Sequence, residues 1–145
     1  MFSVDDVTEL FGFTACAGDD RTYAAHEIVL FEDELTNYGR YYNPNASSFI
    51  CPIDGLYMIS LSISVQSSNS VVDVMRNSQK LSNAWARTDA DLVEYASTTV
   101  VTECLTGDVV WARLDDSGTV SHAIRGYDDY CYTSLSGVLI QATWQ

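Results

Sequence analysis

Three carboxylate side chains lie close together between residues 89 and 94, a grouping that could bind calcium. Asp89, Asp91 and Glu94 fall in a segment that we expect to be a loop preceding a long strand. Oxygen ligands close together in the sequence suit Ca²⁺, which takes about six to eight oxygens in irregular geometry. The alternative is a solvated acidic loop, and the residues favour neither. Calcium is the cofactor that the sequence suggests.

Residues 125–130 combine a scarce basic side chain with two tyrosines and two aspartates. Arg125 is one of seven basic residues, and an arginine near aromatic rings suits a carboxylated sugar, such as a sialic acid, through bidentate pairing and stacking. The favoured alternative is that Arg125 neutralises the aspartates at positions 128 and 129. Recognition usually lies on loops of a rigid scaffold, so the candidate ligand-binding residues here are Arg125, Tyr127, Asp115 and Asp116.

Two further residues are candidates for contact with sugars, one by binding a sugar ligand and one by carrying an N-linked glycan. Trp85 is predicted to lie in a loop and is the candidate exposed platform for stacking on a sugar ring, so it joins the ligand-binding set. Trp111 lies in an alternating strand pattern, which predicts a core position. Asn45 begins the sequon Asn-Ala-Ser, a possible N-glycosylation site that would imply a surface loop and secretion.

Catalytic patterns are absent from the sequence. The two histidines, His26 and His122, lie on separate segments, and no Gly-x-Ser-x-Gly, His-Glu-x-x-His, P-loop or dinucleotide-binding pattern occurs. Neighbouring aspartates such as those at 128 and 129 are typical of turns and do not divide into an acid and a base. The sequence therefore predicts a protein that is not an enzyme.

Length and charge narrow the function classes. The 145 residues form one domain by length, and 47% apolar residues allow a core. The formal net charge of −13, from 20 acidic and 7 basic residues, disfavours binding to nucleic acid or anionic membrane, both of which need a cationic face. No apolar run approaches the length of a membrane span. The first residues lack signal-peptide features, so we expect either a mature secreted chain or a cytosolic one.

The elements that position these residues are predicted to be short strands separated by turns. From Leu56 to Val65 apolar residues alternate with Ser60, Ser62 and Ser64, a period of two that predicts one core face and one polar face. Loop is the favoured interpretation of residues 84–96. The pattern is that of an all-β sandwich, with strands predicted at residues 13–17, 28–32, 49–53, 56–65, 71–76, 96–105, 109–114 and 134–144.

A spaced pattern of aromatic, amide and glycine residues runs through the first third of the chain: Phe31, Asn37, Tyr42, Phe49, Gly55 and Tyr57. It resembles the signature of the globular head of complement C1q and its relatives, the C1q/TNF-like jelly rolls. Three later segments, at residues 93–97, 107–111 and 135–140, also resemble steps of that family. The resemblance implies an all-β, ten-strand, two-sheet jelly-roll sandwich that assembles as a trimer. We divide the chain into an N-terminal arm, 1–12, and a head domain, 13–145.

The resemblance also implies roles for particular residues. Members of the family can bind calcium near the trimer apex through acidic residues of the loop that holds Glu94. The outer face with Met58 and its neighbouring serines would point toward the trimer axis, the alternative being that this face is solvated. Cys16 and Cys131 would lie on neighbouring strands and could form a disulfide, but the favoured expectation is four reduced thiols, with Cys51 and Cys104 buried in strands.

The leading functional hypothesis is a non-enzymatic, secreted, homotrimeric head. It would recognise carbohydrate or protein ligands on cell or microbial surfaces, in a pattern-recognition or lectin-like role of innate immunity. The alternative is a structural or signalling module, such as a matrix, biomineral or cell-contact organiser, that uses its acidic surface to hold calcium. The leading hypothesis predicts saturable sugar binding, and the alternative hypothesis predicts many weak calcium sites.

Overall fold

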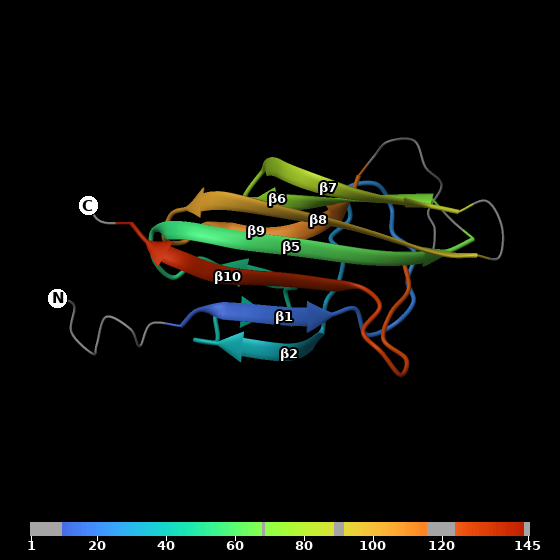
Figure 1. The fold of residues 1–145 in the computed structure, drawn as a ribbon, viewed down its shortest axis with the longest axis horizontal. Coiled ribbons are helices and arrows are strands. Elements are labelled where there is room, and N and C mark those ends of the chain that lie inside the picture. The colour runs from blue at the N-terminus through green and yellow to red at the C-terminus, as the bar shows by residue number, and fades with distance from the viewer. Residues whose placement is uncertain (1–9, 68, 89–91, 116–123, 144–145) are drawn as a thin grey trace.

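The computed structural model describes residues 10–67, 69–88, 92–115 and 124–143, which form two five-stranded antiparallel sheets packed face to face (Figure 1). The strand order is β2-β1-β10-β5-β8 in the first sheet and β3-β4-β9-β6-β7 in the second. This confirms the ten-strand jelly-roll sandwich. The strands are β1 Gly12–Cys16, β2 Asp33–Tyr38, β3 Tyr42–Asn43, β4 Ser48–Ile50, β5 Gly55–Gln66, β6 Asn69–Arg76, β7 Gln79–Arg87, β8 Val93–Cys104, β9 Val109–Leu114 and β10 Ser134–Ala142.

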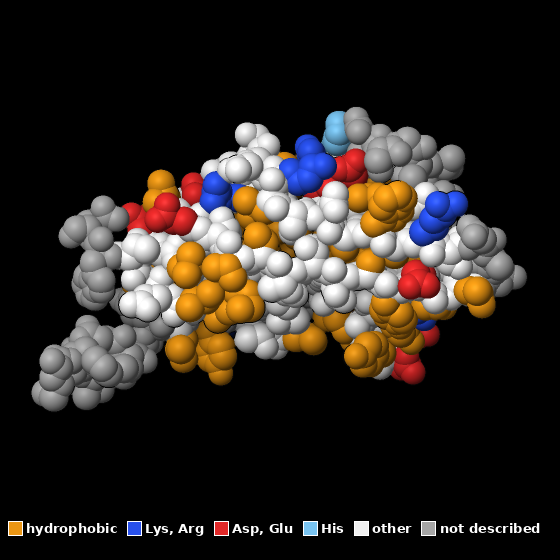
Figure 2. All heavy atoms as spheres, turned by 45° about the horizontal axis from the view of Figure 1, so that its top comes forward, with side chains coloured by type: hydrophobic (Ala, Val, Ile, Leu, Met, Phe, Trp, Pro, Cys, Tyr) orange, Lys and Arg blue, Asp and Glu red, His pale blue; other side chains and the backbone are white. Residues whose placement is uncertain are grey.

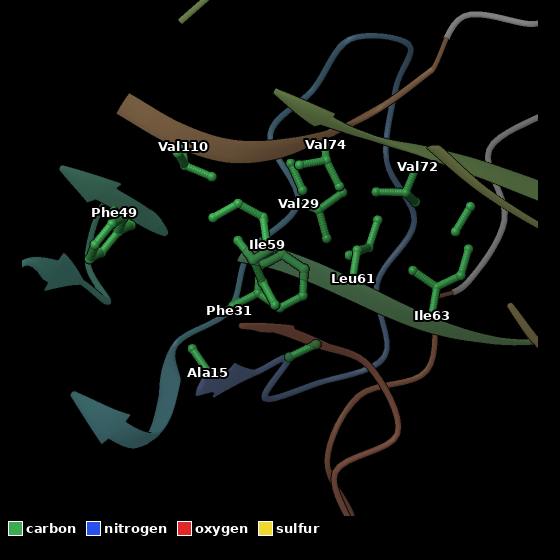
Figure 3. Close-up of a cluster of buried hydrophobic side chains, with 14 of the residues drawn as sticks. Ala15, Val29, Phe31, Phe49, Ile59, Leu61, Ile63, Val72, Val74 and Val110 are labelled. Atoms are coloured by element: carbon green, nitrogen blue, oxygen red, sulfur yellow. The ribbon is translucent and has the colours of Figure 1, made fainter. Parts of the chain in front are cut away.

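The core lies between the sheets and is organised around β5. Every second residue of β5 from Tyr57 to Val65 is fully buried, as the alternation predicts. Figure 3 shows Ile59, Leu61 and Ile63 pointing from β5 toward valines of β6 and β9 on the facing sheet. Aromatic rings fill one end of this core, where Phe13 stacks on both Tyr42, at 4.5 Å, and Phe49, at 4.9 Å between ring centroids.

The spaced pattern near the start of the chain has a structural explanation. The Asn37 amide donates to the Tyr42 carbonyl, 2.9 Å, and accepts from the Tyr42 N–H, 3.2 Å, which closes the turn between β2 and β3. The buried Tyr42 hydroxyl then donates to the Phe31 carbonyl, 2.6 Å. Gly55 is required because a β-carbon there would lie 2.7 Å from the Gln141 carbonyl oxygen.

Two of the predicted elements are wrong. Residues 28–32 do not form a regular strand. They lie beside β9, where the Val29 N–H donates to the carbonyl of Ala112, a residue of β9. Strand β2 begins only at Asp33. The predicted loop at residues 84–96 is strand at both ends. Its start belongs to β7, Gln79–Arg87, which pairs with β6, and its end belongs to β8, which begins at Val93. Val29 and Phe31 in the first segment and Ala84 and Ala86 in the second are buried, so tertiary packing prevails over weak local patterns.

Trp111 is not a core residue, which corrects the prediction. Its neighbours Val110 and Ala112 fill the core side of β9, so the indole of Trp111 points to the opposite face and is only half-buried. There its Nε1–H donates to the carbonyl of Asn77, 2.9 Å, at the turn between β6 and β7. The period of two was read correctly, but the face was assigned wrongly.

The expectation of four reduced thiols is also wrong. Cys16 and Cys131 form a disulfide, with their Cα atoms 5.7 Å apart. Cys16 ends β1 opposite Ser134, the first residue of β10, so the short segment before β10 passes beside it. Cys51 and Cys104 are buried free thiols, as predicted.

Candidate recognition site at the loop end

The end of the sandwich at which β1 and β5 finish and β8 and β10 begin, the loop end, holds a fixed segment before β10. The Ile124 and Arg21 backbones exchange two hydrogen bonds, 2.7 and 3.0 Å, and the Arg125 N–H donates to the Ser64 carbonyl, 2.8 Å. The Gly126 N–H donates to the Asp20 carboxylate, 2.7 Å. A β-carbon at Gly126 would lie 2.2 Å from the backbone of the residue preceding Asp20, so only glycine fits.

This fixed backbone places the Arg125 guanidinium among hydroxyl and aromatic groups. Its Cζ lies 3.8 Å from the centroid of the Tyr132 ring, a cation–π contact. Nη1 donates to the Ser64 hydroxyl, 3.1 Å, and to the Tyr95 hydroxyl, 3.4 Å. Within the described part of the chain these contacts use one face and one nitrogen of the guanidinium, which leaves Nε and Nη2 for an external acceptor.

The acidic neighbours of Arg125 are arranged differently from the favoured expectation. Asp129 accepts a hydrogen bond from the Tyr132 hydroxyl, 3.0 Å, and this bond raises the pKa of Tyr132. No ion pair joins Arg125 to Asp128 or Asp129, both of which the structure describes. Asp129 orients the ring under the arginine, and the charge of Arg125 is left for other groups.

Further tyrosines surround this group at the surface. Tyr127 and Tyr130 are 44% and 63% exposed, and the Tyr130 ring packs against that of Tyr132 at 5.5 Å. Exposed tyrosines offer flat apolar faces and a polar tip at low conformational cost. We call Ser64, Tyr95, Arg125, Tyr130 and Tyr132 the arginine–tyrosine cluster.

Two other predicted ligand residues, Asp115 and Trp85, do not join the cluster. Asp115, just after β9, lies 3.0 Å from the Lys80 ammonium. It neighbours the buried Asp73 carboxyl, whose pKa is raised by burial and then by the hydrogen bond to Asp115. Trp85 is 61% exposed, as predicted, but it lies on β7 of the second sheet, where its indole donates to Asn69, 2.7 Å. Asp116 lies outside the described residues.

The predicted calcium ligands are only partly described. Glu94 lies exposed at the start of β8, opposite Val65 of β5, whereas Asp89 and Asp91 lie outside the described residues. Among the residues that the structure does describe, no three His, Cys, Asp or Glu side chains converge as a metal site. Calcium binding at this loop stays a prediction.

The predicted glycosylation site lies on the surface. Asn45 is exposed in the turn between β3 and β4, where its N–H donates to the Asn43 side chain, 2.9 Å. The Ser47 hydroxyl of the same sequon is buried and accepts from the Phe31 N–H, 2.8 Å. Glycosylation of Asn45 also stays a prediction.

Sequence reasoning missed the residues that hold Arg125. Tyr132 lies only seven residues after Arg125, and this closeness in the sequence could have suggested the pair. Ser64 and Tyr95 come from β5 and β8, which are paired opposite each other. Nothing in the linear sequence associates these strands with residue 125.

The outer face of the first sheet is banded: it carries a row of apolar residues and, next to it, a row of hydroxyl side chains. Register places Met58 beside Val101 on one side and Val138 on the other, and Val138 beside Gly12, itself opposite Tyr38. This apolar row crosses all five strands and borders a shallow cavity of about 330 Å³. Figure 2 shows a hydrophobic patch toward the left of its view, where β5 begins and β10 ends in Figure 1.

A row of hydroxyl side chains runs next to the apolar row. Two of its cross-strand pairs are hydrogen bonded, Thr14 with Ser136 at 2.8 Å and Ser60 with Thr99 at 3.1 Å. Satisfied pairs of this kind stabilise the sheet and need little from a partner. The row comprises Thr36, Thr14, Ser136, Ser60 and Thr99.

The fold defines a class, the C1q/TNF-like jelly rolls, and solved structures share it. The globular domain of zebrafish complement 1qA aligns with a TM-score of 0.74 at 16% identity, covering 91% of this chain and 98% of the other. Murine APRIL aligns with a TM-score of 0.69 at 12% identity, covering 91% and 100%. Eiger TNF from S. frugiperda aligns at 0.65 and 9% identity, covering 94% and 96%. At these identities the likeness shows the fold.

Within this class, the chain belongs to the C1q domain family, whose model matches residues 12–140. The collagen alpha-1(X) chain of Mus musculus is 25% identical over 112 residues, 77% of this chain but 16% of that protein. The resemblance read from the sequence is confirmed. No helix in the described residues is long and apolar enough to cross a membrane.

Proposed function

We propose that the chain is a secreted, non-enzymatic recognition head, assembled as a homotrimer, that binds carbohydrate or protein ligands on cell or microbial surfaces. A pattern-recognition or lectin-like role in innate immunity follows from this activity. The observation that carries the proposal is the arginine–tyrosine cluster. A guanidinium is held on one edge and one face there, with its remaining donors available.

The chemistry of the cluster favours an anionic group beside an apolar one. Nε and Nη2 of Arg125 can pair with both oxygens of a carboxylate, a geometry that a planar guanidinium supports and an ammonium does not. The exposed ring of Tyr130 offers a surface on which a sugar or an apolar side chain can stack. A carboxylated sugar satisfies both features, and an acidic peptide is the protein equivalent.

Replacing Arg125 tests this assignment. We expect Arg125→Ala to weaken binding of a sialylated glycan by about tenfold to a hundredfold, because a hydrogen bond to a charged group contributes roughly 1.5–3 kcal/mol. Arg125→Lys keeps the charge but loses the planar pair, so most of the loss should remain. Glycan-array screening followed by calorimetry measures this. A blank array for the wild-type trimer would defeat the lectin proposal.

The trimer is supported by the banded outer face of the first sheet. An apolar row that crosses five strands, beside a cavity, is unusual for a face that only meets water. Three modest sites on one rigid assembly would gain avidity on a repetitive surface without any new contact. Met58, at the centre of the apolar row, is the position at which a substitution tests this assembly.

Calcium is proposed at the loop that holds Asp89, Asp91 and Glu94. Three copies of an acidic loop near one axis would repel each other, and a cation would relieve that repulsion. We expect millimolar calcium to strengthen the trimer in sedimentation velocity at low protein concentration, and Glu94→Gln to reduce the effect. Magnesium is the matched control ion. A trimer with the same dissociation constant with and without calcium would remove these residues as ligands.

The alternative proposal is a structural or signalling module. It is favoured by the similarity to a collagen chain and by the net charge of −13. It predicts many weak calcium sites per trimer and no selectivity among sugars. Calorimetry with a sialylated glycan separates the two proposals, because the lectin needs a saturable sugar isotherm and the structural module does not. Calorimetry with millimolar calcium then tests the alternative by itself. Absence of calcium binding at that concentration would count against the alternative.

A further inference from the structure

Two thiols from opposite sheets meet at the end of the sandwich away from the arginine–tyrosine cluster. Cys51 follows β4 of the second sheet, and Cys104 is the last residue of β8 in the first. Both side chains are 0% exposed and belong to one buried core cluster, and each thiol is the first cause of the pKa shift of the other. They are the two cysteines that the existing disulfide leaves free.

The backbone holds these thiols in position. The turn that follows Cys104 bonds to Cys51 on both sides: the Cys51 N–H donates to the Asp108 carbonyl, 2.9 Å, and the Gly107 N–H donates to the Cys51 carbonyl, 2.9 Å. On its own strand Cys104 lies opposite Gly55 of β5. Backbone hydrogen bonds therefore hold the turn after Cys104 against Cys51, and both side chains lie in the same buried cluster.

We propose that Cys51 and Cys104 form a second disulfide, which joins the two sheets, when the chain meets a low-molecular-weight disulfide as oxidant. The thiolate of one cysteine attacks the oxidant, forms a mixed disulfide and releases one thiolate. The second cysteine loses its proton to water and attacks the protein sulfur, releasing the other thiolate. Two thiols are oxidised and one small disulfide is reduced to two thiols, so electrons and atoms balance.

The surroundings of the pair indicate the order of these steps. The hydrogen bond from Cys51 lowers the pKa of Cys104, with a contribution from the Arg76 guanidinium, and the same bond raises the pKa of Cys51. Within the proposal we assign Cys104 the first attack, because its pKa is the lower one of the pair. A surface cavity of about 380 Å³ is lined by Glu103 and Leu105, the chain neighbours of Cys104, and by Arg76. Cys104 itself is buried beneath this surface, so a small oxidant reaches the thiol only when the end of β8 opens locally.

A second bridge would complement the first. Cys16–Cys131 closes the loop end within the first sheet. Cys51–Cys104 would tie the first sheet to the second at the opposite end, across a long stretch of chain. Both ends of the sandwich would then be covalently fixed, which restricts the unfolded chain more than either bridge alone. This inference is independent of the ligand and of the trimer.

Peptide mapping tests the bridge directly. Trypsin cuts at the lysine and arginines so that each cysteine falls in a different peptide: 1–21, 41–76, 88–113 and 126–145. The purified chain is refolded in oxidised and reduced glutathione, quenched with an alkylating agent and digested. We expect peptides 41–76 and 88–113 to be recovered joined, and to separate on reduction. Alkylated 41–76 and 88–113 in a sample whose 1–21 and 126–145 peptides are joined would overturn the proposal.

A stability measurement gives a second readout. In the variant Cys16→Ala/Cys131→Ala the proposed pair holds the only cysteines, so oxidised glutathione should raise Tm by about 10 °C. The matched control, with all four cysteines replaced by alanine, should not respond. An unchanged Tm in the two-cysteine variant would contradict the proposal. If that variant does not fold, the peptide map of the wild-type chain decides alone.

Discussion

Replacing Met58 by aspartate is expected to convert the proposed trimer into monomers of 16.0 kDa. Met58 lies at the centre of the apolar row, with Val101 and Val138 directly opposite it on the two neighbouring strands. Its side chain is 40% exposed in the single chain, so the substitution costs the fold little. In the assembly it would bury one carboxylate per subunit without a partner, at a cost of several kcal/mol each. Sedimentation equilibrium measures the mass.

The matched control is Ile50→Asp. Ile50 is a strand residue of similar exposure, 45%, but it lies on β4 of the second sheet. This variant should sediment with the wild-type protein. A Met58→Asp protein that remains a trimer would mean that another surface forms the assembly. A wild-type chain that is already monomeric would remove the avidity argument as well.

The parts of the fold that the sequence predicts are those in which one physical signal dominates. In β5 apolar and serine residues alternate without interruption from Ile59 to Val65, so both the strand and its buried face could be predicted from the period of two. In β7 the sequence is Gln-Lys-Leu-Ser-Asn before it reaches Ala84. Its strand character comes from pairing with β6, a contact that local composition does not reveal.

The face of a strand is harder to predict than its existence. In β9 the residues alternate as expected, yet Trp111 faces away from the core while the smaller Val110 and Ala112 fill it. The alternation predicts that one face is buried, but it does not identify which residues lie on that face. The register with β6, which sets Met75 opposite Trp111, decides the outcome, and register depends on the whole sheet.

The candidate site was also predicted only in part from the sequence. Arg125 could be identified from its scarcity and its tyrosine neighbours, because both are visible in a short segment. Its anchors could not, because Ser64 and Tyr95 lie on strands remote from it in sequence. The expected pairing with the following aspartates treated near residues as partners, whereas Asp129 bonds to the Tyr132 hydroxyl. Charged residues that are close together in the sequence need not be in contact in the folded chain.

The second large effect is expected on removing the Cys16–Cys131 bridge. It links residues separated by 115 positions, so its loss should lower the free energy of unfolding by about 4 kcal/mol and Tm by about 10 °C or more. The variant Cys16→Ala/Cys131→Ala isolates the effect, with thermal unfolding of the wild-type chain as reference and Tyr130→Ala as a control for side-chain loss in the same segment. Equal melting of the double variant and the wild type would contradict the expectation.

The same variant links stability to recognition. Cys131 directly precedes Tyr132, whose ring lies under the Arg125 guanidinium. Without the bridge, the segment before β10 keeps its backbone bonds at residues 124–127 but loses the attachment nearest the ring. We therefore expect ligand affinity to fall at temperatures where the chain is still folded, because the ring must be ordered on binding. Calorimetry well below Tm measures this, and unchanged affinity there would show that residues 124–127 alone position Arg125.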